Sequence, residues 1–293
     1  MKIKVDKDDI RLDTYLSEVL DKSRSQIIKM IKKGEVLVNE KTTKAGLNLK
    51  KDDIIDINHL EEDDETKPEK MDLNIVYEDD DVIVINKDNG IVVHPAPGNY
   101  HHTLVNGLLY HTKLSDLNGK IRPGIVHRID AYTTGLLVVA KNNKSHAILA
   151  EELSLKKTYR KYIALVWGVI KNDSGTIDAP IGRSLNDRKK MAVVGTGKQA
   201  VTHFKVLKRY KDATLIELKL ETGRTHQIRV HMDYIGHPVV NDPVYGRRKL
   251  IDDSGQCLHA KTLGFIHPTT KEYMEFDSEL PECFLNILKY FEK

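Results

Sequence analysis

The chain has 293 residues, of which 40% are hydrophobic and 30% charged, enough to build one large folded domain and one small one. Its 46 basic and 43 acidic residues give a net charge of +3, which excludes a protein that coats nucleic acid with its whole surface. Acidic residues gather at 61–65 and 79–81, so a local basic face is compatible with this average.

Cysteine usage and hydropathy predict a cytoplasmic protein. The two cysteines, Cys257 and Cys283, are far apart and form neither a disulfide framework nor a zinc knuckle. Residues 1–10 lack the apolar core of a signal peptide, and no apolar run approaches the length of a membrane span.

Residues 1–58 are expected to form a small α/β domain. Apolar residues from Leu12 to Leu20 have helical spacing, and a second helix is expected to begin at Ser23 and end at Gly34. Short strands should follow at 36–38 and 53–57. By charge alone, the basic residues on or beside the helices predict a solvated face: Arg11, Arg24, Lys29, Lys32 and Lys33.

Residues 59–72 contain almost no apolar side chains, which predicts a flexible linker. Residues 73–293 form a strand-rich domain. Strands are expected at 82–85, 136–140, 161–167, 201–206 and 214–220, and helices at 145–153, 225–235 and 281–291. Long strands without regular helices between them indicate an α+β fold on a mixed, largely antiparallel sheet with flanking helices.

A short polar loop precedes one of these strands. The segment GIVHRIDAYTTG (124–135) places His127, Arg128 and Asp130 just before a Thr-Thr-Gly turn and an apolar run. Catalytic groups commonly lie on such loops, which a rigid element holds in place. Taken alone, however, the segment is better explained as a turn with an ion-paired surface aspartate.

The histidines do not predict a metal site. His226 and His231 are five residues apart, so they diverge on a helix and lie on opposite faces of a strand. Neither a carboxylate nor a cysteine completes a ligand set with them. Residues 195–198 (GTGK) lack the spacing of a phosphate-binding loop and predict a hairpin turn.

Several segments together resemble one family. GIVHRIDAYTTG resembles the H-R-L-D-x-x-T-S/T-G signature of the RluA-type pseudouridine synthases, which modify ribosomal and transfer RNA. Further segments are similar to that family in the same order: VINKDNGIVVHPAPGN, KKTYRKYIALVWG, LETGRTHQIRVHMDYIGHPVVNDPVYG and CLHAKTLGFIHP. The segment RLDTYL, followed by SRSQIIKMIKKGEVLVNE, resembles the αL RNA-binding domain known from ribosomal protein S4.

This resemblance implies roles for individual residues. The essential aspartate of the family falls on Asp130, and its active-site tyrosine falls on Tyr162. Arg229 falls on the arginine that pairs with the aspartate, and Arg128 on the one that fills the gap left by a flipped base. RNA contacts are expected from His127, Arg224 and the five basic residues of the small domain.

Helical spacing adds one expectation for the site. On a helix over 225–235, Asp233 lies one turn beyond Arg229 and is therefore expected to orient it.

The function implied is that of an isomerase that converts uridine to pseudouridine without cofactor or metal. The αL domain and the run of matches are most similar to the branch acting on 23S, large-subunit ribosomal RNA, while transfer RNA stays open. The family often acts as monomers. Whether Asp130 attacks the sugar covalently or removes a sugar proton is left open by both sequence and resemblance.

The chain departs from the family at two points. Many relatives carry a basic residue and an aspartate where this chain has Ala131 and Tyr132, and a proline after the lysine that aligns with Lys87. An RNA-binding or ribosome-assembly protein that kept the fold but lost activity is therefore an alternative. A metal-dependent nuclease or hydrolase is a third hypothesis, which chelators would test.

Overall fold

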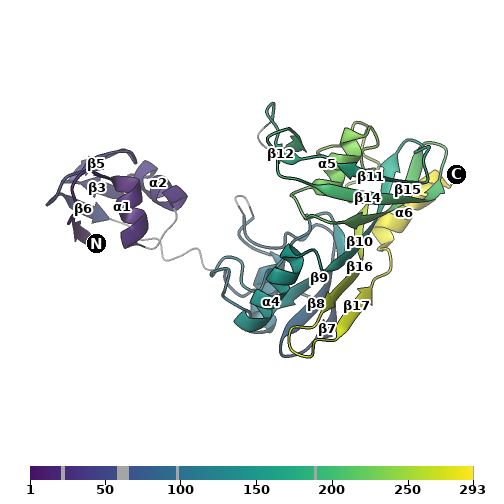
Figure 1. The fold of residues 1–293 in the computed structure, drawn as a ribbon, viewed down its shortest axis with the longest axis horizontal. Helices are drawn as coiled ribbons and strands as arrows, with labels where there is room; N and C mark the ends of the chain where they lie inside the picture. Colours follow the sequence, from purple (N-terminus) through teal and green to yellow (C-terminus); the bar gives the residue numbers. More distant parts are fainter. Residues whose placement is uncertain (21–23, 58–65, 97–98, 188–189, 293) are drawn as a thin grey trace. The chain divides into compact units, whose positions relative to one another are not determined.

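The computed structural model describes residues 1–20, 24–57, 66–96, 99–187 and 190–292, so Ser23 and the acidic cluster at 61–65 lie outside the described residues. The chain divides into two compact units, residues 1–64 and 65–293, each with its own hydrophobic core (Figure 1). Within the described part of the chain, no helix has both the length and the apolar character needed to cross a bilayer.

The N-terminal unit packs two helices against a small antiparallel sheet. Its elements are β1 (Lys2–Lys4), β2 (Ile10–Arg11), α1 (Leu12–Val19), α2 (Arg24–Lys32), β3 (Val36–Val38), β4 (Lys41–Thr42), β5 (Asn48–Leu49) and β6 (Ile54–Ile57). The strand order is β1-β6-β3-β4, and β2 pairs with β5. Leu12, Leu16, Ile27 and Ile55 are completely buried between the layers, as their helical and strand spacing predicts. The small α/β domain is therefore present.

The second half of the expected linker belongs to the larger unit. Residues 59–65 lie outside the described part, but residues 66–72 bind the larger unit through hydrogen bonds. The Thr66 N–H donates to Lys120 O at 3.2 Å, and the Glu69 N–H donates to Asn106 O at 2.9 Å. The Asn106 side chain in turn donates to Lys67 O at 2.7 Å. A polar segment can be ordered by backbone hydrogen bonds, which hydropathy does not report.

The larger unit contains more strands than helices. Its elements are β7 (Ile75–Glu78), β8 (Val82–Lys87), α3 (Leu104–His111), β9 (Thr134–Ala140), α4 (Asn143–Ser154), β10 (Tyr159–Trp167), β11 (Ser174–Asp178), β12 (Ile181–Arg183), β13 (Met191–Val193), β14 (Val201–Arg209), β15 (Ala213–Leu220), α5 (Gln227–Tyr234), β16 (Leu258–Ile266), β17 (Tyr273–Asp277) and α6 (Glu282–Phe291).

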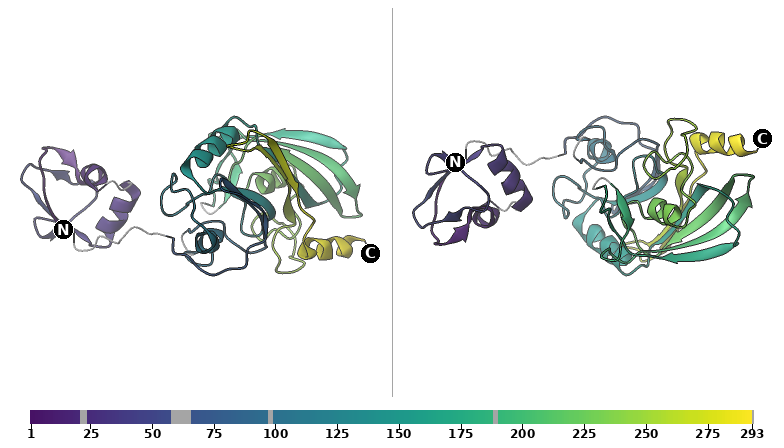
Figure 2. Two further views of the ribbon diagram at one scale, coloured as in Figure 1. Left: turned by 90° about the horizontal axis from the view of Figure 1, so that it is seen from below. Right: turned by 90° about the horizontal axis from the view of Figure 1, so that it is seen from above.

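One long sheet runs through this unit in the order β11-β14-β15-β10-β16-β9-β8-β7, and β17 also pairs with β16. The described pairs are antiparallel except β16 with β9, which are parallel. The sheet curves around α5, and α4 lies beside β9 (Figure 2). The expected α+β architecture on a mixed, largely antiparallel sheet is confirmed.

The parallel contact between β9 and β16 depends on Gly135. Its φ of 106° is strained for other residues, and a Cβ atom there would lie 2.3 Å from Ala260 O. Only glycine allows β16 to approach this closely, at the start of a strand that is buried over its whole length. The polar loop before β9 is thereby held against the centre of the sheet.

The expected strands and helices are all observed, with ends that shift by a few residues. In the larger unit, the sequence missed α3, β16 and the shorter strands β7, β11, β12, β13 and β17. Gly107 and Asn106 weaken the helical signal of α3, although Gly107 lets the Met71 side chain pack 3.1 Å from the position of a Cβ. His259 and Lys261 interrupt the apolar pattern of β16, which is nevertheless a central strand.

Candidate active site

A cavity of about 460 Å³ lies in the larger unit between the loop before β9, strand β10 and the start of α5. Asp130 and Tyr162, which are 32 positions apart in the chain, both line it, and so does Arg229. The sheet brings them together because β9 and β10 both pair with β16. The three residues that the resemblance assigns to catalysis therefore share one site.

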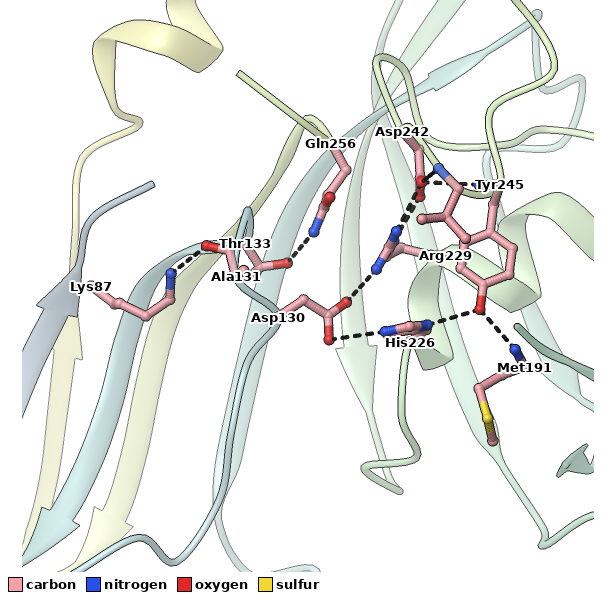
Figure 3. A network of polar contacts seen from close by, with 11 residues as sticks. Lys87, Asp130, Ala131, Thr133, Met191, His226, Arg229, Asp242, Tyr245 and Gln256 are labelled. Atoms are coloured by element: carbon pink, nitrogen blue, oxygen red, sulfur yellow. Dashed lines mark hydrogen bonds and ion pairs between the residues drawn. The ribbon is translucent and has the colours of Figure 1, made fainter. Parts of the chain in front are cut away.

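Asp130 is held by a chain of ion pairs (Figure 3). Arg229 Nη1 donates to Asp130 Oδ2 at 2.9 Å. The Nε and Nη2 atoms of Arg229 donate to the two carboxylate oxygens of Asp242, at 2.7 and 2.9 Å. Arg229 is thus fixed by a bidentate pair and directs its remaining edge at Asp130.

The expectation for Asp233 is wrong. Asp233 accepts a hydrogen bond from Arg247 at 2.8 Å, at the surface, while Arg229 faces the interior with 5% of its side chain exposed. Residues four apart on a helix are neighbours only if their side chains point to the same side. Asp242, which belongs to the quoted segment VVNDPVYG, supplies the orienting carboxylate instead.

The Arg229–Asp242 pair is charged although it is buried. Burial favours the neutral form of Asp242, but hydrogen bonds and the charge of Arg229 outweigh it and lower the pKa of Asp242. The N–H groups of Val244 and Tyr245 add to this effect, donating to Asp242 Oδ1 at 2.8 and 3.0 Å. For Arg229, burial acts against the charge, yet the two aspartates raise its pKa.

His226 and Tyr245 form a second line of contacts to Asp130 (Figure 3). Tyr245 Oη accepts the N–H of Met191 at 3.0 Å and lies 2.8 Å from His226 Nδ1. His226 Nε2 lies 3.8 Å from Asp130 Oδ1, and burial lowers the pKa of His226. His226 has a φ of 56°, in the left-handed region that is unusual for a residue other than glycine.

Lys87 contacts the loop of Asp130 through its ammonium group. Its ammonium donates to Ala131 O at 2.7 Å and to Asp88 O at 2.8 Å, and only 1% of the residue is exposed. Burial lowers the pKa of Lys87 to about 7, against the opposing charges of Asp130 and Asp88. The loop is further fixed by Gln256, which donates to Thr133 Oγ1 at 3.1 Å.

Tyr162 lies on β10, opposite Ala260 and Leu218 on the neighbouring strands, and is largely buried. Burial raises the pKa of its hydroxyl, so the phenol stays protonated at neutral pH. The ring fills part of the cavity wall, where a flat group can stack on a planar ligand.

The three remaining residues expected at the site also line the cavity. Arg128 is exposed and contacts His94 Nε2 at 3.2 Å, and Arg224 is exposed and donates to Gln199 O at 3.0 Å. His127 is half-buried and accepts the N–H of Val138 through Nε2 at 3.1 Å. Burial lowers the pKa of His127 to about 3, so the ring is neutral.

The basic residues of the small domain belong to the other unit. Arg11 and Arg24 both donate to the buried carboxylate of Asp13, at 3.0 and 2.7 Å. Those hydrogen bonds and charges lower the pKa of Asp13. Lys29 and Lys32 are exposed on α2, and Lys33 follows in the turn. Together they make a basic surface on this domain.

One group of described residues, Asp79, Asp81 and His267, has the spacing of metal ligands. His267 Nδ1 accepts the N–H groups of Thr269 and Thr270, so Nε2 carries the proton and donates to Asp79 at 2.9 Å. The group is thus a hydrogen-bonded corner between the β7–β8 turn and the end of β16.

Comparisons with known proteins give matches for both units of the chain. The model of the RNA pseudouridylate synthase family matches residues 81–234, and the S4 domain model matches residues 10–55. A Bacillus subtilis protein named "Uncharacterized RNA pseudouridine synthase YlyB" is 52% identical over 286 residues, covering 97% of this chain and 94% of the relative. The "Ribosomal large subunit pseudouridine synthase D" of Pseudomonas aeruginosa is 44% identical over 299 residues, covering 95% and 91%.

The structure of "Human RNA Pseudouridylate Synthase Domain Containing 1" superposes with a TM-score of 0.59 at 25% identity, covering 75% of this chain and 95% of the human chain. The family match spans the loop of Asp130, the strand of Tyr162 and the helix of Arg229. The chain therefore belongs to the RNA pseudouridylate synthase family of isomerases, and it carries an S4 domain at its N-terminus.

Proposed function

We propose that this enzyme isomerises uridines in large-subunit, 23S ribosomal RNA and that Asp130 performs the chemical step. One observation carries the second part: a carboxylate, ion-paired to a buried arginine, lies at a cavity of about 460 Å³ beside a buried tyrosine. Arg229 favours the ionised form of a neighbouring carboxylate by charge and hydrogen bonding, and an ionised carboxylate is what nucleophilic attack or proton removal requires.

The choice of RNA is supported by relatives. Proteins named "Ribosomal large subunit pseudouridine synthase D" are 44–50% identical to this chain. The exposed cations of the S4 domain suit contacts to RNA phosphates, which give affinity without reading sequence. The proposed compartment is the cytoplasm, where free thiols such as Cys257 and Cys283 stay reduced, and the proposed active form is a monomer.

The position of Asp130 calls for base flipping. Its side chain is 17% exposed, so a uridine stacked in an RNA helix could not reach it. We propose that the target uridine leaves the stack, at a cost of a few kcal/mol, and enters the cavity. Arg128, which is exposed at the cavity wall, is suited to occupy the vacated position in the RNA.

Within the cavity, Asp130 would act on the ribose, either by attack at C1′ or by removing the 2′ proton. The bond between N1 and C1′ breaks, the uracil turns, and a bond forms between C5 and C1′. The proton on C5 then leaves, and N1, which has lost its bond to C1′, takes up a proton. Tyr162 would stack on the base and take part in the proton transfer from C5. Atoms and electrons balance within the substrate, so the proposal needs no redox cofactor.

The test is tritium release from C5-labelled uridine in deproteinised large-subunit ribosomal RNA, comparing wild type with Asp130→Asn. We expect release by wild type and a loss of at least about a hundredfold in the variant, because groups of this kind contribute roughly 10²–10⁴-fold. Equal release by both proteins would refute the role of Asp130.

Transfer RNA and small-subunit ribosomal RNA, labelled in the same way, are the matched substrates. Release from transfer RNA alone would refute the proposed substrate while keeping the chemistry. No release from any of the three RNAs, with binding intact, would favour an RNA-binding protein that lost activity.

A further inference from the structure

Arg160 is a half-buried arginine without a partner. It lies on β10, two residues before Tyr162, and lines the same cavity. Within the described part of the chain its side chain makes neither a hydrogen bond nor an ion pair, and its Nε atom is buried and unpaired. Removing a guanidinium from water without an acceptor is costly, so such an arrangement points to a ligand that supplies the acceptors.

His127 presents a second donor in the same wall. Its Nε2 accepts the N–H of Val138, so in the neutral ring the proton must be on Nδ1. That Nδ1 atom is buried and has no partner among the described residues. Both donor residues line the same cavity, and the charge of Arg160 contributes to the lowered pKa of His127.

The charges of the cavity wall identify the class of ligand. The lining contains four arginines and one carboxylate: Arg128, Arg160, Arg224, Arg229 and Asp130. Arg229 is shared between Asp130 and Asp242, and the three other arginines still leave the wall with a net positive charge. A uracil carbonyl would accept hydrogen bonds but leave this charge unbalanced, whereas a phosphodiester supplies both acceptors and a negative charge.

A glycine lies against the guanidinium of Arg160 in the cavity wall. Gly223, in the loop between β15 and α5, lies against it: a Cβ atom at this position would be 3.0 Å from Arg160 Nη1. A larger side chain there would push on the arginine, so the absence of a Cβ preserves the position of its head group.

We propose that Arg160 and the Nδ1–H of His127 bind a backbone phosphate directly adjacent to the flipped uridine. This inference rests on the proposed function, since it assigns the phosphate to the nucleotide that enters the cavity. Holding that phosphate fixes the ribose relative to Asp130, so it should contribute mainly to substrate binding.

The first test changes the RNA and leaves the protein intact. Once the modified uridine is mapped, a neutral methylphosphonate replaces the phosphate on its 5′ or its 3′ side. With wild-type enzyme, one of the two substitutions should raise KM roughly ten- to a hundredfold, the range expected for losing a charge-assisted hydrogen bond, with kcat little changed.

The second test removes the protein partner. Arg160→Gln should raise KM by a similar factor on unmodified RNA, and the sensitive methylphosphonate should then add less than about twofold, as in a double-mutant cycle. Arg160→Lys should recover part of the loss, because it keeps the charge but not the fork of donors. Lys205→Gln is the control: Lys205 is exposed on β14 and does not line the cavity, so its variant should behave as wild type.

Salt dependence of RNA binding gives a readout that needs no turnover. Arg160→Gln should reduce the slope of log Kd against log salt concentration by about 0.7–0.9, the value for one phosphate contact, and Lys205→Gln should not. This result would support the phosphate site even with an RNA that is not modified, so the site and the proposed function can fail separately.

Three outcomes would overturn the proposal. They are a wild-type enzyme insensitive to both methylphosphonates, an Arg160→Gln variant that keeps full sensitivity and an unchanged salt slope, and a variant that loses kcat alone. Thermal unfolding of each variant distinguishes these outcomes from misfolding.

Discussion

Each unit contains a completely buried aspartate that forms ion pairs with arginine. The arginines are exposed in the small domain and buried in the larger one. In the small domain, Asp13 binds Arg11 and Arg24, whose side chains are 52% and 56% exposed. In the catalytic domain, Asp242 binds Arg229, which is 5% exposed. The first aspartate holds positive charge at the surface, and the second holds it inside the protein.

The difference follows from how each guanidinium group is solvated. Exposed guanidinium groups remain solvated and can exchange water for RNA phosphates. A buried guanidinium must have all of its acceptors built in, and Arg229 obtains them from Asp242 and Asp130. The same pair of residue types therefore gives exposed positive charge in one domain and a fixed, buried arginine at the cavity in the other.

Asp242→Asn should have the largest effect on stability and activity. The variant breaks the buried bidentate ion pair and leaves Arg229 with one ionised partner, Asp130, so the free energy of unfolding of the catalytic domain should fall by about 3–5 kcal/mol. Urea unfolding followed by fluorescence of Trp167, the one tryptophan of the chain, measures this, and tritium release should fall in parallel. Asp233→Asn is the matched control, since its partner Arg247 is exposed and the expected loss is below about 1 kcal/mol. Equal stability of the two variants would contradict the role given to Asp242.

Lys87 is a third case, a buried cation whose hydrogen bonds go to carbonyl oxygens and not to carboxylates. Its pKa falls from 10.5 to about 7 on folding, so between these values the unfolded chain binds more protons and stability increases with pH. Relative to Lys87→Met, the wild-type free energy of unfolding should increase by up to about 1.4 kcal/mol per pH unit between pH 7 and 9. Urea unfolding at pH 6, 7, 8 and 9 measures the difference. A difference that is constant with pH would show that Lys87 keeps its proton.

Asp13→Asn should have the smallest effect. Without the carboxylate, Arg11 and Arg24 lose their orientation but stay solvated, so Kd for ribosomal RNA should rise about two- to fivefold and kcat should be unchanged. Filter binding and tritium release separate the two quantities. Asp56→Asn, which breaks a longer pair with the exposed Lys2, is the control. A fall in kcat would mean that the small domain does more than bind RNA.

The three residues that the resemblance assigns to catalysis could be found from the sequence because they lie in contiguous segments. GIVHRIDAYTTG and its neighbours identify Asp130, Tyr162 and Arg229 from sequence, and the structure places all three at one cavity. The strand-rich pattern also predicted the class of the larger domain. Local periodicity and short motifs carry this information, since each depends on residues close in the chain.

The supporting residues were not predictable for the opposite reason. Lys87 and Asp242 form hydrogen bonds with residues 44 and 13 positions away in the chain. Arg160 stands out only because its buried Nε atom has no hydrogen-bond partner among the described residues. Helical spacing suggested Asp233 as the partner of Arg229, but spacing does not say which side of the helix faces the interior. These contacts form only when the folded sheet brings distant segments of the chain together.

The order of strands also bears on when the site can exist. β16 lies between β10 and β9 in the sheet, although in the chain it comes after both. As the protein leaves the ribosome, β7 to β9 and β10 to β15 emerge as two partial sheets. The first includes the loop of Asp130, which precedes β9, and the second bears Tyr162. Among the described strands, only β16 pairs with both halves. In a nascent chain that ends before residue 258, Asp130 and Tyr162 thus belong to two partial sheets that no strand yet connects.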